Sequence, residues 1–117
     1  MKIQFSPDEL RLLADALVRH TSGLRREIAR TEDLEFKHIL LEKLDILTCL
    51  QSQLATGEVQ LSTANAGVLA EVLDQSEHAL YFEIARTDDR KFKHMLQENL
   101  TCMESAHCKL TQACSAA

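Results

Sequence analysis

The sequence contains few glycine, proline or aromatic residues. Its 117 residues include three glycines, one proline, five Phe and Tyr residues and no tryptophan, so few residues are of the kinds that strand-connecting turns require. No segment approaches the roughly 20 apolar residues that cross a bilayer, and the first residues contain no apolar run of signal-peptide length. We therefore predict an all-α protein that is cytoplasmic and not associated with a membrane.

The net charge and the cysteine content limit the kind of partner and the redox state that we expect. The formal net charge of −5 disfavours nucleic acid as the main partner. With a cytoplasmic location the four cysteines are expected to be reduced thiols rather than a disulfide framework. A chain of this length suits one domain with its own core.

A short segment occurs twice and organises the whole chain. Residues 27–33 (EIARTED) recur at 83–89 (EIARTDD), and Phe-Lys-His begins three residues after each copy. Leucines at helical spacing extend the match on both sides, at an offset of roughly 56 positions. We predict a single domain, 1–117, containing two tandem antiparallel helical hairpins at 5–55 and 61–114. Together they would make a four-helix bundle.

Local signals predict where the helices begin. Ser6, Pro7 and Glu9 form a capping box with proline at the first helical position, so the first helix is expected over about 7–30. Thr31 and Thr87 are predicted as N-caps of the second and fourth helices, which places the second helix at about 32–55. The expected core includes these residues: Leu13, Leu17, Leu24, Phe36, Leu40, Leu47, Leu54, Leu69, Leu73, Leu80, Phe92, Leu96, Leu100, Met103 and Leu110.

With its leucine-periodic helices ending in Glu-Ile-x-x-Thr-acidic-Asp, the chain resembles small bacterial helical-hairpin proteins of uncharacterised function. Both copies of the segment match that turn. The resemblance implies a helical hairpin unit and implies no activity.

The sequence contains two patterns that resemble metal sites, and helical geometry supports neither. Glu35-x-x-His38 and Glu104-x-x-His107 have the di-iron spacing of ferritin-like bundles, but the first pair points away from its helix's apolar stripe while His107 points inward. Cys102, Cys108 and Cys114 diverge around one helix and cannot share a zinc ion. We therefore expect neither a metal nor a cofactor, and, with no catalytic motif in the sequence, no enzymatic activity.

The remaining hypotheses concern binding surfaces. We predict a non-enzymatic interaction or scaffolding module that self-associates as a homodimer, with a further protein partner also possible. A second apolar strip lies beside each core stripe and contains these residues: Leu12, Ala16, Gly23, Ile39, Ile46, Leu50, Val68, Val72, Ala79, Met95, Cys102 and Ala106. On the third helix, the outward-facing Phe82 together with the nearby strip residues suggests an interface at these residues: Phe82, Ala79, Val72 and Val68. The repeated turns could display a polar epitope twice, through these residues: Glu27, Arg30, Asp33, His38, Glu83, Arg86, Asp89 and His94. The alternative is a metal-binding or small-ligand-binding bundle that uses inward-facing His20, His107 and Cys114.

Overall fold

The computed structural model describes residues 1–116. Its elements, in chain order, are β1 (Lys2–Gln4), α1 (Pro7–Arg30), α2 (Leu34–Leu54), β2 (Glu58–Gln60), α3 (Thr63–Arg86) and α4 (Arg90–Ala116). The prediction of an all-α protein with four helices in two tandem hairpins is confirmed. None of these helices is long and apolar enough to cross a membrane.

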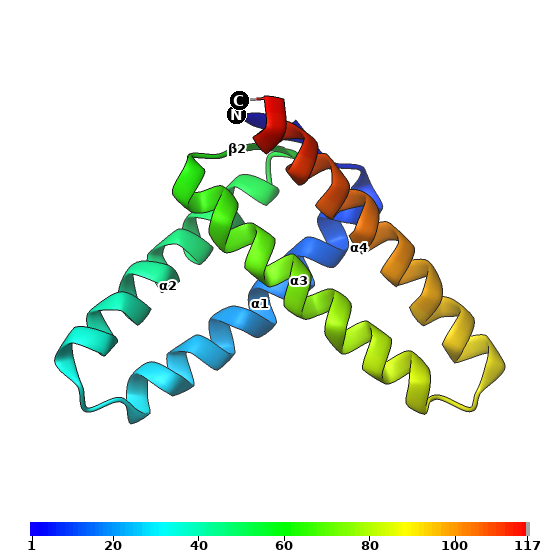
Figure 1. Ribbon diagram of the computed structural model, residues 1–117, viewed down its shortest axis with the longest axis horizontal. Coiled ribbons are helices and arrows are strands. Elements are labelled where there is room, and N and C mark those ends of the chain that lie inside the picture. The colour runs from blue at the N-terminus through cyan, green and yellow to red at the C-terminus, as the bar shows by residue number, and fades with distance from the viewer. Residues whose placement is uncertain (117) are drawn as a thin grey trace.

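The two hairpins cross rather than lying side by side. In Figure 1, α1 and α3 form an X at the centre, α2 and α4 flank it, and the two hairpin turns lie at opposite lower corners. The two ends of the chain meet at the apex. The molecule therefore has a wide V shape, with principal extents of 46 × 35 × 24 Å.

The first residues of the two repeats pair as a short antiparallel ribbon. Ile3 lies opposite Val59, its own repeat equivalent, and Lys2 lies opposite Gln60. The ribbon extends by one residue, since the Leu61 amide donates to the Met1 carbonyl at 2.8 Å. This pairing relates the two hairpins by a local two-fold axis between Ile3 and Val59. The segment between the two hairpins thus contains a strand that joins the halves.

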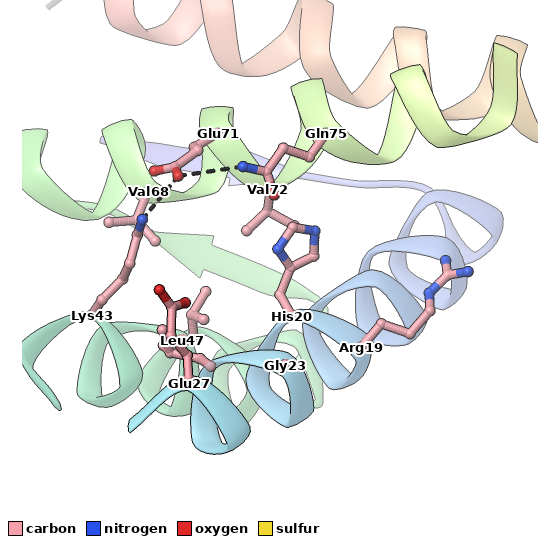
Figure 2. A pocket seen from close by; sticks show the side chains of 11 residues that line it. Arg19, His20, Gly23, Glu27, Lys43, Leu47, Val68, Glu71, Val72 and Gln75 are labelled. Carbon is pink, nitrogen blue, oxygen red and sulfur yellow. Dashed lines mark hydrogen bonds and ion pairs between the residues drawn. The ribbon is translucent and has the colours of Figure 1, made fainter. Parts of the chain in front are cut away.

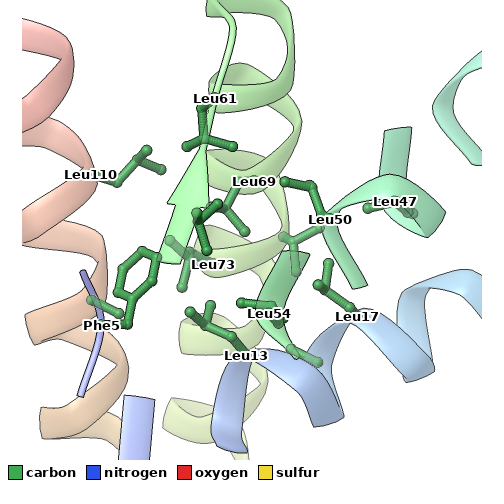
Figure 3. Close-up of a cluster of buried hydrophobic side chains, with 14 of the residues drawn as sticks. Phe5, Leu13, Leu17, Leu47, Leu50, Leu54, Leu61, Leu69, Leu73 and Leu110 are labelled. Carbon is green, nitrogen blue, oxygen red and sulfur yellow. The ribbon is translucent and has the colours of Figure 1, made fainter. Parts of the chain in front are cut away.

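Leucines from both halves form one core. Figure 3 shows Leu13 and Leu17 of α1, Leu50 of α2 and Leu69 and Leu73 of α3 converging where the hairpins cross. Each side chain that is removed from water in this way contributes about 1.5–3 kcal/mol to the stability of the fold. Much of the second apolar strip is buried here too, at these residues: Leu12, Ala16, Leu50, Val72 and Ala106. The hairpins therefore use most of that strip to cover each other.

The N-terminus of α1 follows its sequence signals. The Ser6 hydroxyl accepts from the Glu9 amide at 3.2 Å, and the Glu9 carboxylate accepts from the Ser6 amide at 2.7 Å. Both halves of the predicted capping box are present, and α1 begins at Pro7.

The caps at the hairpin turns are not the predicted threonines. Asp33 caps α2, because its Oδ1 accepts from the amides of Glu35 and Phe36 at 3.0 and 3.3 Å. The Thr31 hydroxyl instead donates to the carbonyl of Glu27 at 2.6 Å, so it completes the end of α1. The helix consequently starts two residues later than expected, because an aspartate is an equally good cap and the threonine already has a partner.

The second turn repeats this arrangement. Asp89 Oδ1 accepts from the amides of Lys91 and Phe92 at 3.0 and 3.3 Å. The Thr87 hydroxyl donates to the carbonyl of Glu83 at 2.6 Å. The predictions for Thr31 and Thr87 were therefore wrong for the same reason.

The two phenylalanines next to the turns also depart from expectation. Phe36 and Phe92 were predicted in the core, but they are 44% and 39% exposed. Each lies near a hairpin tip, beyond the crossing (Figure 1), where only two helices meet. Two helices cannot enclose an aromatic ring that lies away from the line of contact between them.

Candidate functional site

One face of α2 is half covered by the other hairpin. Helical spacing places Phe36, Ile39, Lys43, Ile46 and Leu50 on this face. Leu50 is buried, and Ile46 packs partly buried against the core. Towards the tip the cover ends, and Ile39 is 59% exposed.

The equivalent face of α4 is also half covered by the other hairpin. Phe92, Met95, Asn99, Cys102 and Ala106 share this face. Ala106 is fully buried and Cys102 packs against the core, whereas Met95 is 47% exposed. Each hairpin thus has a long docking face whose inner half is covered and whose outer half is open.

An ion pair between a buried carboxylate and a partly exposed lysine joins the two hairpins on one side of the crossing. Lys109 Nζ of α4 donates to Glu9 Oε1 of α1 at 2.6 Å and to the Gln4 carbonyl at 3.4 Å. The Glu9 side chain is only 3% exposed. Burial raises the pKa of Glu9, but hydrogen bonds from Lys109, the Ser6 amide and Ser105 outweigh it, so the pKa lies below its ordinary value.

The corresponding place in the other half carries no charge. Asn65 and Gln53 are the repeat equivalents of Glu9 and Lys109. The Asn65 amide donates to the Ser62 hydroxyl at 3.2 Å, and Gln53 Oε1 accepts from the Gln60 amide at 2.6 Å. Like Lys109, Gln53 therefore connects the second helix of a hairpin to the backbone of the ribbon.

Two open grooves flank the crossing and are repeat equivalents of each other. The first, of about 420 Å³, lies between α1, α2 and α3, and the second, of about 570 Å³, lies between α1, α3 and α4. Both are lined by Arg19, His20 and Gln75, at the point where α1 and α3 meet.

An ion pair between α2 and α3 crosses the first groove. Figure 2 shows Lys43 reaching Glu71, with Nζ to Oε1 at 2.8 Å, and the His20 ring lying against Val72. Burial lowers the pKa of His20 and Arg19 lowers it further; Glu71 opposes this and Lys43 adds to it. His20 therefore favours its neutral form in the groove.

The residues predicted to form a third-helix interface do not form one surface. Phe82 is 70% exposed, and the Arg86 guanidinium lies 5.9 Å from its ring centroid. Ala79 is exposed and Val68 is half-buried, but Val72 is only 3% exposed and belongs to the core. The expected patch is therefore interrupted, because α3 uses the Val68 and Val72 side of its surface to pack against the first hairpin.

The repeated turn residues lie at the two tips of the V, so they form two separate surfaces and not one site (Figure 1). Asp33 and Asp89 serve as caps. His38 Nε2 lies 3.2 Å from Glu42, and His94 Nε2 lies 3.0 Å from Glu98, each one helical turn along. The rest of the predicted epitope is exposed at both tips: Glu27, Arg30, Glu83 and Arg86.

The inward polar groups of the alternative hypothesis have separate surroundings. His20 lies in the grooves, whereas His107 Nδ1 lies 2.9 Å from Glu77 Oε1. Cys114 was predicted to face the core but is exposed, with its Sγ 3.9 Å from Met1 Sδ. Within residues 1–116, no group of three or more His, Cys, Asp and Glu side chains is arranged to hold a metal ion.

Of the cysteines, Cys102 has the most distinctive environment. Burial raises the pKa of its thiol, and Glu9 and Asp8 raise it further, while Arg11 and Lys109 oppose this. The thiol therefore stays protonated near neutral pH, which makes it a poor nucleophile.

No protein family, no curated protein and no solved structure matches this chain. The class of protein that the fold defines is an all-α tandem repeat of two crossed helical hairpins. Its function is accordingly argued from the docking faces, the ion pairs and the grooves.

Proposed function

We propose that this protein is a non-enzymatic helical interaction or scaffolding module that self-associates. The observation that carries the proposal is the open outer half of each docking face, where Phe36, Ile39, Phe92 and Met95 are 39–59% exposed. Single exposed apolar residues are common, but apolar residues grouped on a helix face mark interaction surfaces.

The charged groups in the crossing support a structural use. Lys109 pairs with Glu9, Lys43 with Glu71 and His107 with Glu77, at 2.6, 2.8 and 2.9 Å. Each of these groups is held by a partner of opposite charge or by a hydrogen bond within the chain. Such pairs fix how helices sit on one another, whereas an acid–base catalyst needs a group that faces a substrate.

Sedimentation velocity over a micromolar to millimolar concentration series tests this function. We expect the average mass to rise above that of the monomer as concentration increases. A monomeric mass throughout the series would reject self-association.

A second candidate function is small-ligand binding in the first groove. The observation that favours it is the grouping of Arg19, His20 and Lys43 on the walls of a groove of about 420 Å³, which lies within the size range of ligand sites. Lys43 is paired with Glu71 and His20 favours its neutral form, so Arg19 would supply the positive charge and the His20 ring N–H a hydrogen bond to a small anion. Titration with inorganic phosphate, followed through the His20 ring signals by NMR, would show saturable shifts if this function holds and none if it does not.

A further inference from the structure

We infer that self-association uses the outer half of each docking face, and that each outer half-face accepts the outer half-face of a second copy of this chain. The first outer half-face consists of Gly23 and Glu27 of α1 with Phe36 and Ile39 of α2. The second consists of their repeat equivalents: Ala79, Glu83, Phe92 and Met95. The inference rests on the proposed self-association and specifies where it occurs.

Each outer half-face is continuous with an interface that already exists within the chain. On α2, the face that buries Leu50 and half-buries Ile46 at the crossing continues past Lys43, which pairs with Glu71, to Ile39 and Phe36. On α1, the stripe that buries Leu12 continues to Gly23 and Glu27 in the same way. A surface that binds one hairpin along its inner half has the shape and chemistry to bind another along its outer half.

The two repeats share the residues of their outer half-faces more closely than the polar residues where the hairpins cross. Where the hairpins cross, the polar residues have diverged between repeats: Glu9 and Asn65, Lys109 and Gln53, Lys43 and Asn99, His20 and Ser76. The outer half-faces have kept their chemistry: a small residue (Gly23, Ala79), an acid (Glu27, Glu83), an aromatic (Phe36, Phe92) and a flexible or branched apolar residue (Ile39, Met95).

Turn geometry does not explain this similarity. The turns require Asp33 and Asp89 as caps, but the rings of Phe36 and Phe92 take no part in capping and remain exposed. Two surfaces that must bind the same partner would retain the same exposed groups.

Each outer half-face also has charges that complement a second copy of itself. Arg30 lies one helical turn beyond Glu27, and Arg86 lies one turn beyond Glu83. When two such faces pack with their first helices antiparallel, the acid of each lies near the arginine of the other. A face with this pattern is complementary to its own kind, as a two-fold interface requires.

The geometry also sets the size of the assembly. The hairpins pack face to face at the crossing, with α3 lying over α1 in Figure 1, so their docking faces point in opposite directions. The two outer half-faces consequently lie on opposite sides of the molecule. A copy bound to one leaves the other free, so association continues past the dimer instead of closing.

The test compares four full-length proteins by sedimentation velocity. One variant carries Phe36→Ser and Ile39→Ser, the second carries Phe92→Ser and Met95→Ser, and the third carries all four changes. We expect the wild type to exceed the mass of a dimer at high concentration, each double variant to reach no more than a dimer, and the quadruple variant to remain monomeric.

A matched control lies on the opposite side of α2. Leu34 and Leu41 are 79% and 41% exposed, and helical spacing places them away from Phe36 and Ile39. The Leu34→Ser, Leu41→Ser variant removes similar apolar surface from the same helix and should associate like the wild type. Circular dichroism confirms that each variant is folded.

The outcomes separate this inference from the proposed function. A wild type that associates, with a quadruple variant that associates equally well, overturns the half-faces and leaves self-association intact. If Phe82→Glu or the Leu34→Ser, Leu41→Ser control loses association while the quadruple variant keeps it, the half-faces are likewise overturned and self-association stands. A monomeric wild type overturns both.

Charge reversal provides an independent check on the arrangement. Glu27→Arg together with Glu83→Arg places like charges opposite one another and should weaken association by at least tenfold. Adding Arg30→Glu and Arg86→Glu restores opposite charges and should recover most of it. Equal association by all these proteins would overturn the antiparallel pairing.

Discussion

The two sides of the crossing have the same backbone plan and different chemistry. On one side α4 is fixed to α1 by the ion pair of Lys109 with the buried Glu9. On the other, Gln53 of α2 binds the backbone of β2, and Asn65 replaces the glutamate. In a two-fold homodimer both sides would be identical by symmetry; joining two copies in one chain removes that constraint. The difference shows that the polar residues of each half can change independently while the ribbon retains its local two-fold axis.

Removing the ion pair on the charged side of the crossing should have the largest effect on stability. Lys109→Met removes the ammonium group and leaves the Glu9 carboxylate, which is 3% exposed, without its main partner. The stranded buried charge should lower the free energy of unfolding by about 1–3 kcal/mol. Urea unfolding followed by circular dichroism measures this change. The equivalent variant on the neutral side, Gln53→Met, should cost about 0.5–1.5 kcal/mol, and an equal loss in both would show that the two sides do not differ energetically.

Removing the turn caps should give the next largest effect, and it should be the same in both halves. Asp33→Ala and Asp89→Ala each delete an acceptor for two amides, which costs about 0.5–2 kcal/mol. Denaturant midpoints compare these variants with Asp33→Asn, which keeps a capping oxygen and should stay close to the wild type. Thr31→Val serves as a second control; a loss larger than that of Asp33→Ala would restore the threonine as the principal group at the turn.

The ion pair of Lys109 with Glu9 should also give the charged side a pH dependence of stability that the neutral side lacks. Because the pKa of Glu9 is lower in the folded protein than in the unfolded chain, its contribution is complete above the ordinary glutamate pKa. It is lost as pH falls through the lowered value. Glu9→Gln should therefore flatten the stability profile in that acidic window. The measurement is the free energy of unfolding across this pH window, with Glu58→Gln as an exposed control. If Glu9→Gln retained the wild-type slope, as the control should, the prediction would be wrong.

The smallest expected effect concerns the two grooves. His20 in the first repeat corresponds to Ser76 in the second, and the His20 pKa lies below its ordinary value because of burial and Arg19, with Glu71 opposing and Lys43 adding. Stability is then complete above the ordinary histidine pKa and falls as pH drops towards the lowered value. His20→Ser should remove this shallow slope. Melting temperatures at a series of mildly acidic pH values are the measurement, and an unchanged slope would show that His20 is not responsible.

Local signals in the sequence determined the helices and their pairing into hairpins. The capping box at Ser6 and Glu9 placed the start of α1 correctly, and leucines such as Leu13 and Leu73 are buried as their spacing predicts. These features depend on interactions between residues a few positions apart, so they can be derived from the chain alone.

The tertiary structure alone decided which apolar faces are covered. Periodicity places Val72 and Ile39 in equally apolar strips, yet Val72 is 3% exposed and Ile39 is 59% exposed. The strands at Lys2–Gln4 and Glu58–Gln60 are too short to show an alternating pattern, and they form because each is the other's partner. The ion pair of Glu9 with Lys109 joins residues at opposite ends of the sequence. All three depend on where the hairpins cross, and that position is set by contacts between halves that no local pattern encodes.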